Sequence, residues 1–134
     1  MATTATVTTL LDGTKHRVIH VALTSDGTAS QLTDSVIYDY SADTNLPEDS
    51  VAGSNKIQKV IFTNSSGAQI DIEFAGATDG LALTCPAGVT EDMEFDEIGG
   101  IKNIATTPTG DITLTTRSFG NNQTAVLVIC MDKS

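Results

Sequence analysis

Residues 70–74 read Ile-Asp-Ile-Glu-Phe, so that apolar and acidic side chains alternate along them. Successive side chains of a β-strand point to opposite faces of the sheet, and this period of two is typical of a strand with one face on a core and the other in water. Residues 92–96, Asp-Met-Glu-Phe-Asp, repeat the pattern. Both segments are therefore predicted to be strands whose acidic faces lie in solvent.

The chain on either side of these two segments is built in the same way. Short runs rich in Val, Ile, Thr and Phe alternate with turn-forming residues such as Gly99-Gly100 and Pro108-Thr-Gly110. No window has the period of a helix. Eight or nine short strands at this spacing predict an all-β fold, an antiparallel β-sandwich of which a jelly roll is one form, with little or no helix. The strands are expected at about 3–11, 15–24, 31–39, 56–63, 68–75, 81–85, 92–98, 112–118 and 124–131.

The length of 134 residues is typical of one domain, so we expect residues 1–134 to form a single sandwich. Residues 1–8 have strand propensity but little to bury, and they are expected to form an extended N-terminal arm or an edge strand. The longest irregular stretch, residues 40–55, is the expected variable or contact loop.

Two segments are apolar on both faces: Ala125-Val-Leu-Val-Ile-Cys-Met131, and residues 17–23, in which Arg17 and His20 are the polar residues. A sandwich strand normally exposes its outer face to solvent. Each of these runs must therefore be central and covered by a loop or the N-terminal arm, or must contact another chain. The second alternative predicts a homo-oligomer or another protein partner. The candidate interface residues are Val126, Leu127, Val128, Ile129, Val18, Ile19 and Val21.

The charge of the chain restricts its partners. Seventeen acidic and seven basic side chains give a formal net charge of -10, which repels a phosphate backbone or an anionic membrane surface. We therefore expect neither nucleic acid nor membrane as a partner, and a basic protein surface fits the sign better. The N-terminus lacks the basic start and apolar core of a signal peptide, and Cys85 and Cys130 lie in apolar runs, so synthesis in a reducing cytoplasm with free thiols is expected.

No group of residues in the sequence predicts catalysis, so the chain is expected not to be an enzyme and to hold no cofactor. His16 and His20 are four residues apart on one predicted strand, which separates them by about 13 Å, too far for a shared metal. Asp92, Glu94 and Asp96 share a strand face and could attract Ca²⁺, but a strand lacks the curvature of a ligand cage. A solvated negative face is the preferred interpretation, and no metal site is assigned.

Two stretches resemble a small virion structural protein of tailed bacteriophages. Residues 95–116 contain a Gly-Gly-Ile-Lys-Asn corner at 99–103 and a Thr-Gly-Asp-Ile segment at 109–112, and residues 2–21 are similar to the start of such a chain. The resemblance covers about a third of the sequence. It implies a capsid decoration or cement protein on the virion surface, bound to the major capsid protein outside the head lattice, often as a trimer.

Two alternatives remain beside this expectation. One is a tail, neck or head-fibre component that adheres to a host surface or glycan through residues 41–55 and 76–80. The other, from a different class, is a small metal-dependent lectin or β-sandwich enzyme that uses Asp92, Glu94 and Asp96.

Overall fold

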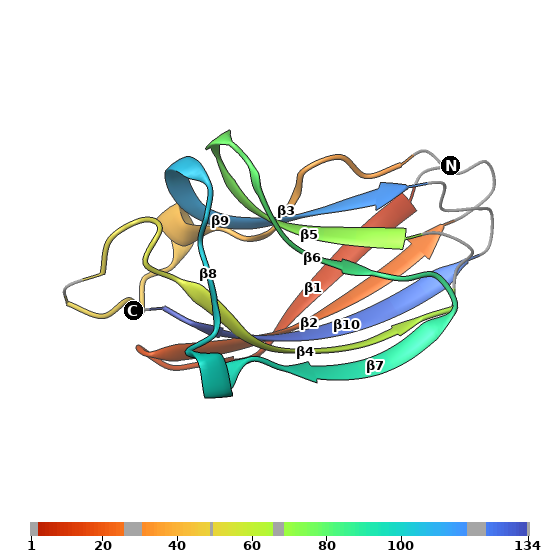
Figure 1. Cartoon of the computed structure of the whole chain (residues 1–134), viewed down its shortest axis with the longest axis horizontal. Coiled ribbons are helices and arrows are strands. Elements are labelled where there is room, and N and C mark those ends of the chain that lie inside the picture. Colours follow the sequence, from red (N-terminus) through yellow and green to blue (C-terminus); the bar gives the residue numbers. More distant parts are fainter. Residues whose placement is uncertain (1–2, 26–30, 49, 66–68, 118–122, 134) are drawn as a thin grey trace.

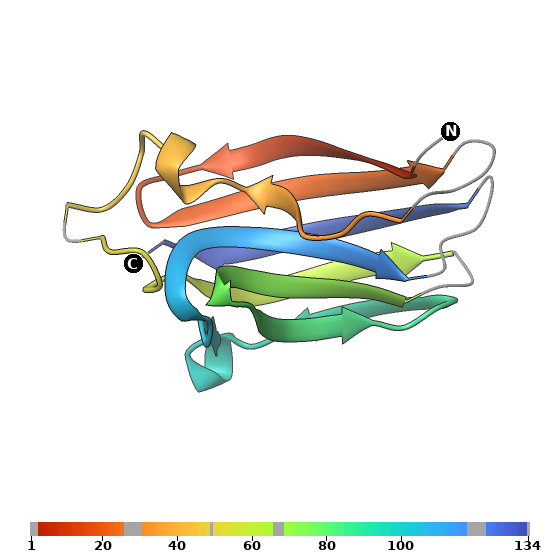
Figure 2. The same ribbon diagram turned by 90° about the horizontal axis from the view of Figure 1, so that it is seen from above.

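The fold is a sandwich of two antiparallel sheets, seen edge-on in Figure 1 and from above in Figure 2. This computed structural model describes residues 3–25, 31–48, 50–65, 69–117 and 123–133. Two short 3₁₀ turns, η1 (Tyr40–Ala42) and η2 (Asp96–Ile98), accompany the strands. The strands are β1 (Thr3–Asp12), β2 (His16–Ser25), β3 (Ser35–Tyr38), β4 (Lys56–Asn64), β5 (Gln69–Thr78), β6 (Gly80–Cys85), β7 (Val89–Glu94), β8 (Ile101–Lys102), β9 (Thr106–Arg117) and β10 (Thr124–Asp132).

The strand order is that of a jelly roll. One sheet has the order β1-β2-β10-β4-β7, with β8 also paired to β4, and the other has the order β3-β9-β5-β6. The chain crosses between the sheets at β2–β3, β3–β4, β4–β5, β6–β7, β8–β9 and β9–β10, which produces the interleaved order of two Greek keys. The predicted all-β, antiparallel sandwich is confirmed. The first strand is an edge strand, so residues 3–8 do not form a detached arm.

Three predicted boundaries are wrong, the first two for identifiable local reasons. The strand expected over 92–98 ends at Glu94, because the Phe95 carbonyl accepts hydrogen bonds from the amides of Ile98 (3.1 Å) and Gly100 (2.8 Å) and closes η2. The segment Pro108–Gly110, expected to be a turn, lies inside β9, where Gly110 has a φ of +86° and packs against the Tyr40 ring. The strand expected over 31–39 is shortened to β3.

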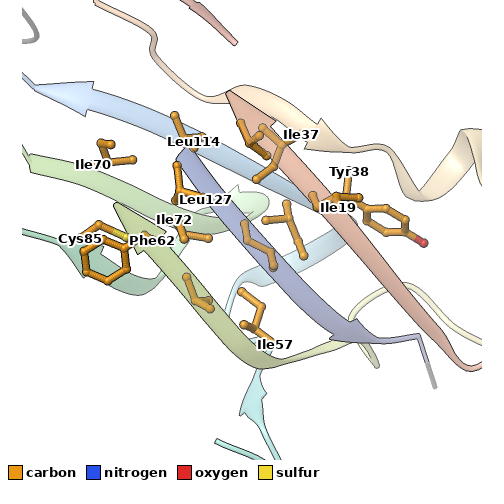
Figure 3. Packing of buried hydrophobic residues seen from close by; sticks show 14 of the residues in the cluster. Ile19, Ile37, Tyr38, Ile57, Phe62, Ile70, Ile72, Cys85, Leu114 and Leu127 are labelled. Atoms are coloured by element: carbon orange, nitrogen blue, oxygen red, sulfur yellow. The ribbon is translucent and has the colours of Figure 1, made fainter. Parts of the chain in front are cut away.

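The core lies between the two sheets. The inward side chains of β5, Ile70, Ile72 and Phe74, are fully buried, as the alternation predicts. Figure 3 shows Leu127 from one sheet, with Leu114 and Ile72 from the other, in the layer between the sheets. Burying an aliphatic or aromatic side chain of this size stabilises the fold by about 1.5–3 kcal/mol.

The acidic faces of the two alternating segments differ. Asp92 and Glu94 on β7 are exposed, as predicted. Asp71 on β5 is only 4% exposed, which corrects the expectation that this face lies in solvent. The Asp71 carboxylate accepts hydrogen bonds from the Thr84 hydroxyl (2.9 Å) and the Gln69 amide (3.2 Å), and these bonds compensate for its burial.

A buried group of charges fixes one end of the sandwich. The Lys133 ammonium lies 2.6 Å from Asp12 and 2.9 Å from Asp43, and the Tyr38 hydroxyl donates to Asp43 at 2.7 Å. Arg17 lies 3.3 Å from the same Asp43 carboxylate and stacks over the Tyr38 ring. These contacts tie the 39–55 loop and the end of β10 to the β1–β2 hairpin.

Candidate functional site: an apolar sheet face and an acidic cluster

The six-stranded sheet carries an apolar outer face at its centre. Val126, Val128 and Cys130 of β10 alternate with the core residues of that strand and therefore point outward. Residues directly opposite one another on neighbouring strands share a face, which extends this surface onto β2 and β4. We call this surface the outer apolar face; it consists of Val18, His20, Ala22, Ile61, Val126, Val128 and Cys130.

The outer apolar face is open to solvent along the described chain. Val126 is 39% exposed and Ile61 is 38% exposed, whereas Val18, His20 and Val128 are half-buried by their neighbours. Figure 1 shows no described segment crossing this side of the sheet. The alternative in which a loop or the N-terminal arm covers the strand therefore does not hold for the described residues, since β1 pairs with β2 at the sheet edge.

The seven candidate interface residues divide between the two faces. Val18, Val126 and Val128 point outward and belong to the outer apolar face. Leu127, Ile129, Ile19 and Val21 are at most 1% exposed and belong to the core, so they are not available to a partner. The sequence alone does not distinguish the two groups, because both faces of these strands are apolar.

The carboxylates beside this face are neutralised. Lys59, next to Cys130 across the ladder, lies 2.8 Å from Glu94 and 3.8 Å from Asp92. The hydrogen bond to Glu94 raises the pKa of Lys59, and the charges of Asp92 and Glu94 raise it further, while burial acts in the opposite direction. Asp96 begins η2 and is not on the strand, so the three-carboxylate strand face expected from the sequence does not form.

The two histidines lie on the outer side of β2, as expected from their spacing. His20 is opposite Val128 and His16 is opposite Asp132 on β10. Both rings are half-buried. They are separated along the strand, so each belongs to a different part of the sheet surface.

An acidic cluster that the sequence does not predict lies on the opposite sheet. One carboxylate oxygen from each of Asp34, Glu73 and Asp79 lies within 4.8 Å of the other two. Asp34 precedes β3, Glu73 is on β5, and Asp79 forms the β5–β6 turn, where it accepts a hydrogen bond from the Gly76 amide at 3.2 Å. The Thr115 hydroxyl donates to Glu73 at 2.7 Å.

The members of this cluster repel one another. Burial raises the pKa of Glu73, and the charges of Asp34 and Asp79 raise it further, while the hydrogen bond from Thr115 acts in the opposite direction. Among the described residues, no Lys or Arg forms an ion pair with any of the three. The three residues come from separate elements, which explains why no local sequence motif reveals them.

A polar hollow of about 310 Å³ lies at the end of the sandwich near β8, lined by Gly53, Ser54, Asn55, Lys56, Lys102 and Asn103. Its amides bond to the protein itself: Asn103 donates to Asn55 (3.1 Å), which donates to the Gly110 carbonyl (2.8 Å). These bonds hold the corner between β4, β8 and β9 in place.

Comparisons with known proteins identify no family for this chain. No protein-family model matches the chain, and no curated protein matches it. The crystal structure of an RmlC-like cupin protein from Desulfovibrio desulfuricans is similar over 93% of this chain and 80% of its own, with 10% identity and a TM-score of 0.32. A similarity of this size identifies neither a family nor an activity.

In the described residues, no helix has the length and apolar character needed to span a membrane.

Proposed function

We propose that this chain is a virion structural protein of a tailed bacteriophage, a decoration or cement protein that binds the outside of the head lattice. The observation that carries the proposal is the outer apolar face. It lies on the central strands β2, β10 and β4, and no described segment covers it. An exposed, contiguous apolar surface on a small domain is typical of a protein–protein contact.

The occupant of this face is the major capsid protein. The net charge of -10 fits a basic surface on another protein better than a second acidic copy as the partner of this sheet face. On the head, the copies stand as trimers around a symmetry axis, as the sequence resemblance implies. The jelly roll is also a fold used for viral capsid and lectin domains, which is compatible with the proposal but does not by itself assign a function.

The mechanism is linkage between binding and shell state. A protein that binds the expanded shell and not its precursor stabilises the expanded state by RT ln(1 + [L]/Kd) per site. The decoration protein needs no catalytic group for this role, because the stabilisation depends only on the difference between its affinities for the expanded shell and for the precursor shell.

Binding to heads that lack the protein tests the proposal. Purified wild-type protein is expected to co-sediment with such heads, and electron cryo-microscopy is expected to show its density on the outer surface. Absence of that density from the head refutes the proposed function. The mass in solution is a second measurement, and a trimer supports the proposed assembly.

A matched pair of variants tests the role of the face. Val126→Asp places a charge on the outer apolar face, whereas Val36→Asp changes a valine that is 50% exposed on the other sheet. Val126→Asp is expected to weaken head binding by at least about tenfold, the equivalent of 1.4 kcal/mol, and Val36→Asp is expected to leave it unchanged. Equal binding by both variants contradicts the assignment of this face.

A tail, neck or head-fibre role is the second candidate. The two loops proposed for adhesion approach one end of the sandwich, since Gly53 packs against Pro108 and Pro108 is paired with Gly76. A glycan array or host-cell pull-down tests this role, and binding that survives Val126→Asp favours it over the capsid role.

A further inference from the structure

We propose that Asp34, Glu73 and Asp79 bind a divalent cation, with Ca²⁺ as the preferred ion. Their three carboxylate oxygens lie within 4.8 Å of one another. Ca²⁺ binds oxygen at 2.3–2.6 Å, so a single ion placed between these oxygens reaches all three. The proposal concerns the four-stranded sheet and is independent of whether the other sheet binds a capsid.

The first supporting observation is the absence of a counter-charge within the described chain. Two other groups of carboxylates are neutralised by lysine: Asp12 and Asp43 by Lys133, and Asp92 and Glu94 by Lys59. The acidic cluster has no such partner among the described residues, although its three carboxylate oxygens lie within 4.8 Å of one another. A bound cation supplies the missing positive charge.

The second observation is an unpartnered hydroxyl beside the cluster. Thr113 is 2% exposed, and its Oγ1 is buried without a hydrogen-bond partner among the described residues. Thr113 is directly opposite Glu73 in the β5–β9 ladder and opposite Val36 in the β3–β9 ladder, so its side chain stands on the outer face beside Glu73. A buried hydroxyl without a partner is costly, and an ion or its bound water next to Glu73 provides one.

The chemistry of the donor set selects Ca²⁺. All three ligands are carboxylates, which favours a hard cation over Zn²⁺ with its preference for imidazole and thiolate. Asp34 and Asp79 are exposed, which leaves room for water to complete an irregular shell of the kind that Ca²⁺ accepts and Mg²⁺ does not.

The ion would join three separate segments. Figure 1 shows the β5–β6 turn and the segment leading into β3 on the same side of the four-stranded sheet, facing away from the other sheet. Glu73 lies on the sheet between them. A cation held by all three residues therefore fastens both segments to the sheet surface.

Calorimetric titration of the full-length protein with Ca²⁺, after treatment with EDTA, tests the site at pH 7. We expect saturable binding with one ion per chain and a Kd of about 10⁻³ M or tighter, with weaker binding of Mg²⁺. At ten times the Kd, Ca²⁺ is expected to raise the Tm by about 5 °C. Absence of both binding heat and a Tm shift at 10 mM Ca²⁺ overturns the proposal.

Glu73→Gln separates ligand loss from unfolding. Glutamine retains an oxygen that accepts the Thr115 hydrogen bond but removes the charge, so the variant is expected to bind Ca²⁺ at least about tenfold more weakly. In EDTA it is expected to melt at or above the wild-type Tm, because one repulsive charge is gone. Glu94→Gln, which changes a neutralised carboxylate on the other sheet, is the control and is expected to bind Ca²⁺ like the wild type. Wild-type affinity in Glu73→Gln, or an equal loss in Glu94→Gln, contradicts the assignment.

Discussion

Lys133 and Asp43 form an ion pair that solvent does not reach. Their charged atoms are 2.9 Å apart, and the two side chains are 0% and 1% exposed. The pair joins the residue after β10 to the 39–55 loop. An isolated buried charge is strongly unfavourable, so each residue depends on the other.

Replacement of Lys133 by methionine tests this dependence. Lys133→Met preserves much of the side-chain volume but leaves the Asp43 carboxylate with Tyr38 and Arg17 as its side-chain partners. The free energy of unfolding in urea is expected to fall by about 3–5 kcal/mol. Lys15→Met, at an exposed lysine in the β1–β2 turn, is the control and is expected to change it by less than about 0.5 kcal/mol. Wild-type stability in Lys133→Met contradicts the structural role of the pair.

Acid is expected to destabilise the protein through Asp43. Burial alone would raise the pKa of this carboxyl, but hydrogen bonds from Lys133, the Asn45 amide and Tyr38 outweigh it and lower the pKa below the ordinary 3.8. A group with a lowered folded-state pKa stabilises the protein above its unfolded-state pKa, and this contribution is lost as the pH falls through the folded-state value. The free energy of unfolding is therefore expected to decrease below about pH 4. Denaturation in urea at several pH values measures the slope, and an equal slope in Lys133→Met speaks against this origin.

The two thiols are expected to react at different rates. Cys85 is 0% exposed, and burial, with a smaller effect of Asp71, raises its pKa to about 12. Cys130 is half-buried on the outer apolar face. Burial raises the pKa of its thiol, and the nearby positive charge of Lys59 offsets part of that increase. At pH 8 a disulfide reagent is expected to modify Cys130 slowly in the folded protein and both thiols in denaturant. Rapid modification of both in the folded state contradicts the placement of Cys85.

The strand pattern was predictable where polarity alternates. Ile70, Ile72 and Phe74 mark both the strand and its inward face, because a polar residue stands between each apolar pair. In β10 no such contrast exists, and Val126 differs from Leu127 only through the register of the strand in the sheet. The sequence could therefore predict a central strand but not which of its residues meet solvent.

The polar sites were less predictable because their parts are distant in the sequence. Asp34, Glu73 and Asp79 meet only through the order of β3, β9, β5 and β6. Lys133 follows a long apolar strand, where a lysine is usually solvated, and its burial depends on an aspartate in a distant loop. The local pattern of polar and apolar residues therefore predicts neither the acidic cluster nor the Lys133–Asp43 ion pair.

The position of β10 sets the order of events during synthesis. It is C-terminal to every other described strand, yet it lies between β2 and β4, which leave the ribosome earlier. Until it arrives, those two strands present unpaired backbone edges, and a nascent chain in that condition is a target for chaperones and for aggregation. Folding of the six-stranded sheet is therefore expected to wait for β10 and to be slow, because the β2–β10 ladder joins segments that are far apart in the sequence.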